Sequence, residues 1–358
     1  MRKIFIRSSL VFFWILLIFT ALYWPKWHIL PFEENTINIF AWGDILDPDV
    51  IKSFQEETGI NVNLNYYSSN EELIVKLKAT RGEGYDLIIP SDYAVKVLVH
   101  EELLKELDHE KLHFWNVLNP ALLDHFFDPE NRYSIPFEWE IYGLGIDKDF
   151  FAKYPREPSW DMVFDLKSMN YKITMINDPI EAVQFASYFM HGPLPSLNAE
   201  QTSQVTDLLI RQKAWVTAYA NFRGDYFLAT KNCAVVIASS SYIWRTMRMF
   251  DFVNFVIPKE GTFITIENLC IPIASQKEKH VYRFINYLYR PQSIVSHYNT
   301  YGFFPATLHA IDLLNTDPQA EQLMRSTEED FQKYHFTRTI LPQEELRDIW
   351  VEVKSGSL

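Results

Sequence analysis

Short apolar runs alternate with amphipathic segments along two stretches of the chain, residues 36–101 and 172–271. Runs rich in β-branched and apolar side chains predict strands, and apolar residues at helical spacing predict helices. The predicted strands are 36–41, 60–66, 86–89, 172–176, 216–219, 235–238, 255–257 and 264–271. The predicted helices between them are 49–57, 73–80, 93–101, 179–190 and 200–213. This alternation predicts an α/β fold with parallel strands joined by crossover helices.

Local signals place some helix ends. Gly59 ends the helix 49–57, because glycine readily adopts the left-handed conformation of a C-terminal cap. Ser69 and Glu72 have the spacing of a capping box that opens the helix 73–80. Further helices are predicted at 276–289, 292–299, 306–314, 317–334 and 343–353. No Gly/Ser linker separates the two α/β stretches, so we expect two lobes joined by strands that cross between them.

The first 32 residues differ from the rest. Residues 1–7 carry three basic side chains, and residues 8–24 form a largely apolar run without charge. A basic start before an apolar run is typical of an export signal, and this run also reaches the lower length of a membrane-spanning helix. We expect residues 1–32 to be a signal sequence or an N-terminal membrane anchor, with the body of the chain outside the cytoplasmic membrane. A buried core helix is the alternative.

The length of 358 residues fits about two domains. The chain has 33 basic and 46 acidic residues, a net charge of −13; without the four basic residues of the first 32, the count is 29 to 46, or −17. Such a body is a poor match to nucleic acid, which needs Lys and Arg against phosphate. It suits a cationic ligand better, although solubility alone accounts for an acidic surface.

The chain lacks several signatures of enzymes and metal sites. It contains no G-x-S-x-G elbow, Walker loop or H-E-x-x-H motif, and no Cys/His spacing of a zinc site. We therefore predict no catalytic residue, metal or cofactor. Cys233 and Cys270 lie in apolar runs and are interpreted as small buried hydrophobes, with a disulfide as the alternative.

Polar and aromatic residues follow three predicted strands. They are Trp42 and Asp44 after 36–41, Ser91 and Tyr93 after 86–89, and Asp178 and Glu181 after 172–176. In an open parallel sheet, ligands bind beyond the carboxyl ends of the strands. Ring faces and carboxylates both attract ammonium groups, so this set suits an organic cation.

Each of these residues also has a purely structural interpretation. Asp178 and Glu181 have the spacing of an N-cap and the third residue of a helix. Trp42 fits a core position, Ser91 or Asp92 fits the cap of the helix 93–101, and Asp44 fits a solvated turn. The local sequence leaves these alternatives open.

Several motifs occur in an order that resembles the periplasmic spermidine/putrescine-binding proteins of bacterial ABC importers. They are NTINIFAW at 35–42, FQEETGINV at 54–62, SNE at 69–71, YDLIIPSDY at 85–93, YSIP at 133–136, PKEG at 258–261 and FINYLYRP at 284–291. The resemblance covers about residues 35–305. It implies the two-lobed type II periplasmic binding protein fold, each lobe a central, mostly parallel sheet flanked by helices, with the ligand cleft between the lobes. The lobe boundaries that it implies are 34–143 plus 267–307, and 144–266 plus 308–358.

The same resemblance implies a function and roles for individual residues. The protein would capture a polyamine, spermidine or putrescine, for the membrane permease of an ABC importer. Trp42, Ser91 and Tyr93 match the family's aromatic platform and its Pro-Ser-x-Tyr pair. Asp178 and Glu181 match the acidic D-x-x-E pair that binds ligand amines. Glu267 stands where the family has an Asp in its second crossing strand.

The chain departs from the family pattern at several positions. Thr265 and Ser239 stand where tryptophans are expected, and Gly43 and Ile45 replace a hydroxyl residue and a tyrosine. Tyr242, Trp244 and Trp139 are candidates to compensate. The alternatives are a type II binder for another ligand, a binding protein that feeds a sensor, and a hydrolase that uses Asp178, Glu181 or Glu267 as acid and base. We expect a periplasmic monomer that has no nucleic-acid partner and contacts the membrane through its N-terminal segment alone.

Overall fold

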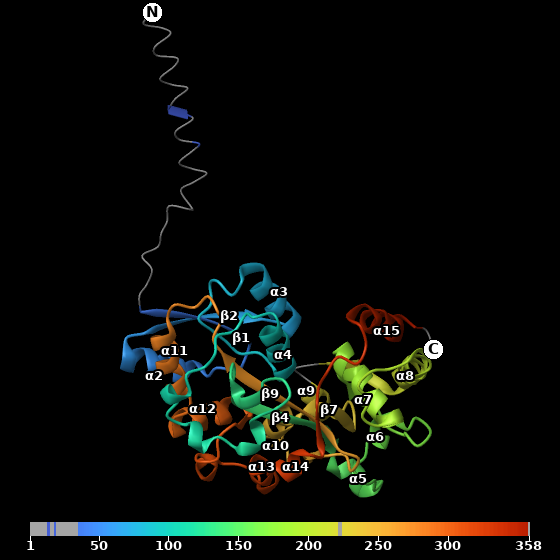
Figure 1. The fold of residues 1–358 in the computed structure, drawn as a ribbon. Helices are drawn as coiled ribbons and strands as arrows, with labels where there is room; N and C mark the ends of the chain where they lie inside the picture. Colours follow the sequence, from blue (N-terminus) through green and yellow to red (C-terminus); the bar gives the residue numbers. More distant parts are fainter. Residues whose placement is uncertain (1–12, 15–17, 19–34, 221–223, 357–358) are drawn as a thin grey trace, which may run out of the picture. The chain divides into compact units, whose positions relative to one another are not determined.

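The computed structural model describes residues 13–14, 18, 35–220 and 224–356, and Ile37–Leu358 form one compact unit (Figure 1). The strands are β1 (Thr36–Trp42), β2 (Asn61–Tyr67), β3 (Leu87–Ile88), β4 (Ser134–Asp147), β5 (Ile173–Met175), β6 (Val216–Tyr219), β7 (Val235–Ser239), β8 (Val253–Val256), β9 (Thr262–Cys270), β10 (Phe304–Pro305) and β11 (Tyr334–Phe336). The helices are α2 (Pro48–Thr58), α3 (Asn70–Thr80), α4 (Asp92–His100), α5 (Lys148–Lys153), α6 (Asp161–Phe164), α7 (Pro179–His191), α8 (Ala199–Gln212), α9 (Gly224–Ala229), α10 (Ser240–Met247), α11 (Glu278–Leu288), α12 (Pro291–Tyr301), α13 (Pro318–Met324), α14 (Glu328–Phe331) and α15 (Gln343–Ser355). Six short 3₁₀ turns lie between them: His109–Lys111, Trp115–Val117, Pro120–Leu122, Pro129–Asn131, Lys213–Trp215 and Ile311–Leu313.

The strands form one mixed sheet in the order β2-β1-β3-β9-β4-β7-β5-β6, with β8 and β10 also paired to β4 and β11 paired to β9. The pairs β1–β3, β5–β6 and β5–β7 are parallel, as the alternation of strands and helices predicts. The pairs that involve β4 with β7, β8, β9 and β10 are antiparallel. Two parallel parts are therefore joined through the two antiparallel strands β4 and β9.

Strand β4 crosses between these two parts. It pairs with β9 over its first half and with β7 and β8 over its second half. All of its residues are buried, so its sequence lacks the alternation of apolar and polar residues that identifies a half-exposed strand. Gly143 lies where the second half begins, and a Cβ there would come within 2.4 Å of the Phe255 ring. The glycine thus lets β4 pass close to β8.

The buried side chains form two hydrophobic clusters. One contains the sheet around β1, β3 and the first half of β4, with α2, α11 and α12 against it. The other contains the second half of β4, β5, α7 and α8, with α15 lying against both helices (Figure 1). The first cluster also takes in apolar residues of α13 and α14 and several from the stretch 228–255. The lobe boundaries given above stay a prediction.

Some helix predictions are wrong. The predicted helix 306–314 is only the 3₁₀ turn Ile311–Leu313, and the predicted helix 317–334 is two short helices, α13 and α14, followed by β11. The predicted helix is interrupted after Met324, and Thr327 caps the separate helix α14. Strand β11 then pairs in parallel with β9, and this long-range pairing overrides the helical pattern at Tyr334. Ser69 does cap α3, but Glu72 accepts its hydrogen bond from the Ser68 amide rather than from Ser69, so the capping box is incomplete.

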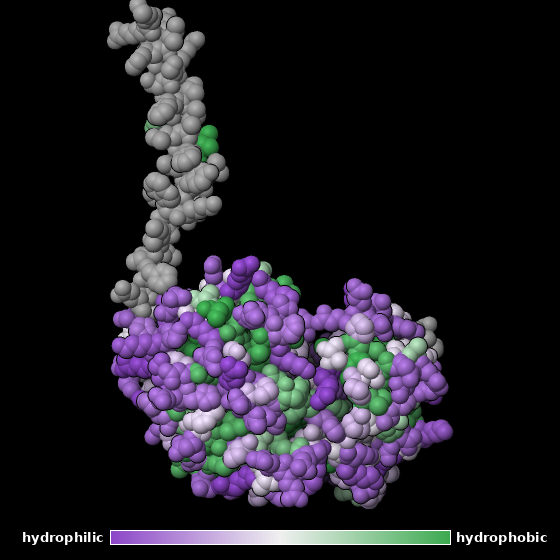
Figure 2. Space-filling view, viewed as in Figure 1, coloured by the Kyte–Doolittle hydropathy of each residue, from purple (hydrophilic) through white to green (hydrophobic). Residues whose placement is uncertain are grey.

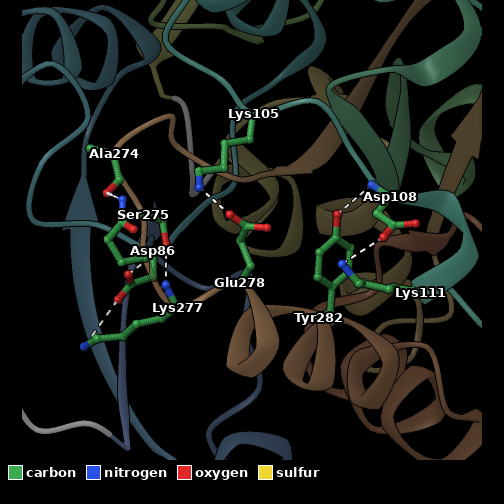
Figure 3. Close-up of polar contacts among 10 residues, drawn as sticks. Asp86, Lys105, Asp108, Lys111, Ala274, Ser275, Lys277, Glu278 and Tyr282 are labelled. Atoms are coloured by element: carbon green, nitrogen blue, oxygen red, sulfur yellow. Dashed lines mark hydrogen bonds and ion pairs between the residues drawn. The ribbon is translucent and has the colours of Figure 1, made fainter.

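A polar network ties the segment before α11 back to β3 (Figure 3). The Asp86 carboxylate accepts a 2.9 Å hydrogen bond from Ser275 Oγ and lies 3.8 Å from Lys277 Nζ. Lys105 pairs with Glu278, and Tyr282 Oη accepts a 2.7 Å hydrogen bond from the Asp108 amide. These contacts join residues 86–108 to residues 275–282, next to the hydrophobic cluster that contains β1 and β3.

Two further predictions concern the N-terminal leader and the two cysteines. Among the described residues, none belongs to a helix long and apolar enough to span a membrane. The predicted leader, 1–32, lies almost wholly outside the described residues. Cys233 and Cys270 are buried free thiols, which confirms their interpretation as small hydrophobes and excludes the disulfide.

Candidate functional site

A cleft lies beyond the ends of β1, β3 and β5 and against the crossing strands β4 and β9. Its space is about 1140 Å³, part of it open to solvent. Figure 2 shows the surface hollowed between the part that carries α3 and α4 and the part that carries α7 and α15. The lining residues that bear on its chemistry are Trp42, Glu71, Ser91, Tyr93, Glu140, Tyr142, Asp178, Glu181, Ser239, Tyr242, Thr265, Glu267 and Phe303.

Glu267, in β9, is the best-anchored carboxylate of the cleft. Its Oε2 accepts a 3.0 Å hydrogen bond from Trp42 Nε1, and its Oε1 accepts a 2.6 Å hydrogen bond from Ser91 Oγ. Ser91 Oγ in turn accepts a 3.1 Å hydrogen bond from the Asn70 amide. Ser91 occupies the N-cap position of α4 without a side-chain capping bond, because its hydroxyl is committed to Glu267. The predicted side-chain cap at Ser91 is therefore not formed, and Ser91 lines the cleft.

Tyr93 and Trp42 supply aromatic surface on the same side. Tyr93 Oη donates a 2.8 Å hydrogen bond to Glu71, which lies in the first turn of α3. The Trp42 ring packs against Tyr67 with 4.6 Å between ring centroids. Both rings are half-buried and line the cleft, so each is held by the fold and still presents a face to it.

Asp178 and Glu181 come from the first turn of α7, directly after β5. Asp178 Oδ1 accepts hydrogen bonds from the amides of Ile180 (2.8 Å) and Glu181 (3.0 Å), as a helix cap does. Its other oxygen, Oδ2, has no partner among the described residues and remains available. Tyr142 Oη donates a hydrogen bond to Glu181. The capping interpretation of Asp178 is confirmed, and it uses one oxygen only, so a ligand-binding role for the other oxygen stays a prediction.

Glu140 brings a further carboxylate from β4. It is the register partner of Thr265 on β9, and its Oε2 accepts a 2.7 Å hydrogen bond from Ser241 Oγ. The small side chains of Ser239 and Thr265 also line the cleft here. Tyr242 lines it too, whereas Trp139 and Trp244 are buried and do not.

Burial makes four carboxylates of the cleft difficult to ionise. Burial raises the pKa of Glu267 to about 8; the neighbouring charges of Asp92 and Glu140 add to this rise, and the hydrogen bonds from Ser91 and Trp42 oppose it. Burial likewise raises the pKa of Glu140, of Asp178 and, most strongly, of Glu181, whose pKa the Asp178 charge raises further.

No Lys, Arg or His occurs among the described residues that line the cleft. Five carboxylates therefore share it without a cationic side chain: Glu71, Glu140, Asp178, Glu181 and Glu267. A bound cation would relieve both the repulsion among them and their lost hydration. Within the described ranges, no group of three or more His, Cys, Asp or Glu side chains has an arrangement that could hold a metal ion.

Six of the seven predicted site residues line this one cleft: Trp42, Ser91, Tyr93, Asp178, Glu181 and Glu267. Asp44 is not among the lining residues, and its side chain is exposed, as its solvated-turn interpretation expects. Glu71 was not predicted, although it follows the strand 60–66 and the same strand-end rule could have found it. Glu140 and Tyr142 lie inside β4, where that rule gives no signal.

Comparison with known proteins adds family relationships to this geometry. The family model described as bacterial extracellular solute-binding protein matches residues 49–324. A putrescine/agmatine-binding protein of Pseudomonas aeruginosa is 26% identical over 90% of this chain and 93% of its own length. The putrescine-binding periplasmic protein PotF of Escherichia coli is 28% identical over 76% of this chain and 78% of its own. The solved structure of a putative spermidine/putrescine ABC transporter protein from Listeria monocytogenes superposes with a TM-score of 0.78 at 26% identity, covering 90% of this chain and 100% of that one.

Proposed function

Because the chain belongs to the bacterial extracellular solute-binding protein family, we propose that its cleft captures a polyamine such as putrescine or spermidine for the permease of an ABC importer. The observation that carries the proposal is the set of five carboxylates around one cleft that has no cationic side chain among its described lining residues. The two-lobed α/β fold predicted from the sequence is confirmed by the likeness to solved binding proteins. Names of relatives support the ligand class, since they include binders of putrescine, agmatine and spermidine.

Within the proposal, the acidic residues contact the ammonium groups of the ligand and the aromatic residues contact its methylene chain. Asp178 Oδ2 and Glu181, from α7, and Glu267, from β9, receive the ligand's ammonium groups. Trp42 and Tyr93 lie along the methylene chain, where cation–π contacts add about 0.5–2 kcal/mol each. Micromolar capture needs a net of about 8 kcal/mol, which several charge-assisted contacts supply after desolvation costs.

Closure of the two lobes would mark the loaded state. Asp178 and Glu181 lie at the start of α7, which packs in the second hydrophobic cluster. Trp42 and Tyr93 lie on β1 and α4, which pack in the first cluster. A ligand that contacts both sides favours the closed form over the open one by its differential affinity. With the lobes bounded as 34–143 plus 267–307 and 144–266 plus 308–358, the crossing strands β4 and β9 form the hinge.

The family places the chain outside the cytoplasm. Within the proposal, the protein is a periplasmic monomer that meets the membrane through residues 1–32, either as a cleaved signal or as a retained anchor, and that uses no cofactor. Its partners are the polyamine and the importer's permease. Catalysis by the carboxylates, the hydrolase alternative, has no support from a family of solute-binding proteins.

Calorimetry on the full chain with putrescine, spermidine, agmatine and spermine tests the proposal. The neutral isostere 1,4-butanediol is the control ligand, since it matches putrescine in length but lacks charge. Binding of at least one amine with no binding of the diol supports the proposal. If none of the four amines binds at millimolar concentration, which corresponds to a binding free energy of about −4 kcal/mol, the proposal is overturned.

A double variant tests the named residues. Asp178→Asn with Glu181→Gln removes both charges, yet Asn keeps the oxygen that caps α7. We expect the affinity to fall by about 100-fold or more, because each charged hydrogen bond is worth about 1.5–3 kcal/mol. Glu344→Gln with Glu345→Gln is the matched control, because these exposed acids also lie in the first turn of a helix, α15. Normal binding by the cleft variant would leave Asp178 as a cap alone.

A further inference from the structure

A second, small cavity lies behind the cleft, between β4, β10 and α12. Its lining includes Glu138, His297, Thr307 and the apolar side chains of Phe137 and Phe303. Phe303 also lines the main cleft, so its ring lies at the wall between the two spaces. We call this space the Phe303 cavity; it has room for about one particle the size of water.

Three polar side chains of the Phe303 cavity are buried and unsatisfied. Glu138 is 3% exposed, and His297 and Thr307 are each 1% exposed. Glu138 Oε2, His297 Nε2 and Thr307 Oγ1 have no hydrogen-bond partner among the described residues. A buried polar atom without a partner costs about 1–3 kcal/mol, so three around one cavity indicate a missing partner rather than chance.

The hydrogen-bonding roles of the three atoms follow from their surroundings. His297 Nδ1 lies 2.8 Å from the carbonyl oxygen of Ser293, one helical turn earlier in α12. A carbonyl only accepts, so Nδ1 carries the hydrogen and Nε2 of the neutral ring is left as an acceptor. Burial lowers the pKa of His297, which keeps the ring neutral. The Glu138 carboxyl offers Oε2 as an acceptor in its ionised form, which a cation favours, and the Thr307 hydroxyl can accept as well.

The electrostatic surroundings favour a positive occupant. Glu138 faces Glu267 across the β4–β9 ladder, and burial, together with the charges of Glu267, Glu140 and Asp47, raises the pKa of Glu138 well above its ordinary value. A positive occupant beside Glu138 would favour the ionised carboxylate and lower that pKa. No Lys or Arg lies among the described residues that line the cavity. Three acceptors, one of them a carboxylate without a counter-charge, match the three N–H donors of a primary ammonium group and its single charge.

We propose that the Phe303 cavity is a receptor for one ammonium group, in which Glu138, His297 and Thr307 each accept one N–H hydrogen bond. Two sources share this chemistry. One is the free ammonium ion, which a cavity of this size accommodates. The other is the end of an alkylamine that lies in the cleft and passes Phe303, and this second source alone rests on the proposed function.

Thermal unfolding of the full chain tests the proposal in ammonium chloride against potassium chloride at equal concentration. Potassium matches ammonium in size and charge but has no N–H donor, so it controls for ionic strength and for nonspecific cation binding. At a salt concentration about ten times the dissociation constant, we expect ammonium to raise the melting temperature by about 2 °C over potassium. Equal melting temperatures in the two salts would overturn the proposal.

Two variants separate the cavity from the cleft. Glu138→Gln keeps the side-chain shape but removes the charge and should abolish the difference between ammonium and potassium. Thr307→Val, of nearly equal shape, should reduce that difference and serves if Glu138→Gln does not fold. Glu344→Gln is the control, and it should keep the difference because Glu344 is exposed in the first turn of α15 and lines neither the cleft nor the cavity. If ammonium still stabilises both cavity variants more than potassium does, ammonium binds at another site and the proposal is overturned.

Repeating the measurement with saturating putrescine or spermidine distinguishes the two sources. If ammonium still adds stability, the cavity takes the free ion while the cleft holds the amine. If ammonium adds nothing more, the amine's own end fills the cavity. Since the measurement without polyamine stands by itself, failure of polyamine capture and failure of the ammonium receptor give different results.

Discussion

Trp42 Nε1 donates a 3.0 Å hydrogen bond to Oε2 of Glu267, a residue 225 positions later in the chain. The bond joins the end of β1 to the crossing strand β9 at the floor of the cleft. It holds the indole ring and the carboxylate in fixed relation, so aromatic surface and negative charge meet a ligand together.

Replacing Trp42 by Phe separates these two contributions. The phenyl ring keeps aromatic surface in the cleft but cannot donate a hydrogen bond to Glu267. We expect polyamine affinity to fall by about 3- to 30-fold, since one hydrogen bond to a charged group contributes about 1–2 kcal/mol. Calorimetry measures the change. Trp215→Phe is a control outside the cleft lining and should bind normally; an unchanged affinity in Trp42→Phe would show that the indole nitrogen does not matter.

Glu267→Gln should change stability in a pH-dependent manner. The pKa of Glu267 rises from 4.5 to about 8 on folding, so the fold prefers the neutral carboxyl. Stability is therefore lost as the pH rises from 4.5 through about 8, and the loss is complete above that range; for one group it amounts to at most about 5 kcal/mol. Glutamine is neutral throughout. We expect the variant to be more stable than the parent at about pH 8.5 and nearly equal to it at about pH 4.5.

Thermal melts of both proteins across this pH range check that prediction, without ligand present. A variant that is less stable than the parent at alkaline pH would show that hydrogen bonding, rather than the cost of burying charge, dominates at Glu267.

Polyamine binding should release protons. Near pH 7, the raised pKa of Glu267 leaves much of its carboxyl protonated in the ligand-free protein. A bound ammonium group favours the ionised form and lowers that pKa, so the proton leaves as the ligand binds. Titrations in buffers of different ionisation enthalpy should give more exothermic heats as the buffer's ionisation enthalpy grows. Glu267→Gln should release fewer protons, and heats independent of the buffer would contradict the prediction.

Gly143→Ala should destabilise the contact between β4 and β8. Its Cβ would lie 2.4 Å from the Phe255 ring and 2.8 Å from the Val256 carbonyl oxygen, so β4 and β8 would have to separate. We expect a loss of about 1–3 kcal/mol in the free energy of unfolding, measured by denaturant titration. Gly43→Ala is the matched control for stability, because a Cβ at Gly43 meets nothing within 4 Å. Equal stability of the two variants would show that β4 and β8 separate enough to accept the added Cβ at little cost in free energy.

The sequence alone determined much of the site because the chemistry follows the strand ends. Trp42, Ser91, Tyr93 and Asp178 lie at or just beyond the end of a strand with a clear apolar pattern, and parallel strands bring their carboxyl ends to one edge. The resemblance to polyamine-binding proteins added Glu267, which no strand-end rule selects. The acidic composition already favoured a cationic ligand.

Tertiary structure alone decided what lies on the crossing strands. Strand β4 is buried along its whole length, so no alternation distinguishes its buried acids Glu138 and Glu140 from surface residues. Pairing with β9 over long sequence separations places one acid in the cleft and the other in the Phe303 cavity. The parallel β11–β9 pairing likewise overrode a helical pattern near residue 334. Local sequence encodes which strands and helices form, whereas non-local contacts decide which buried charges meet.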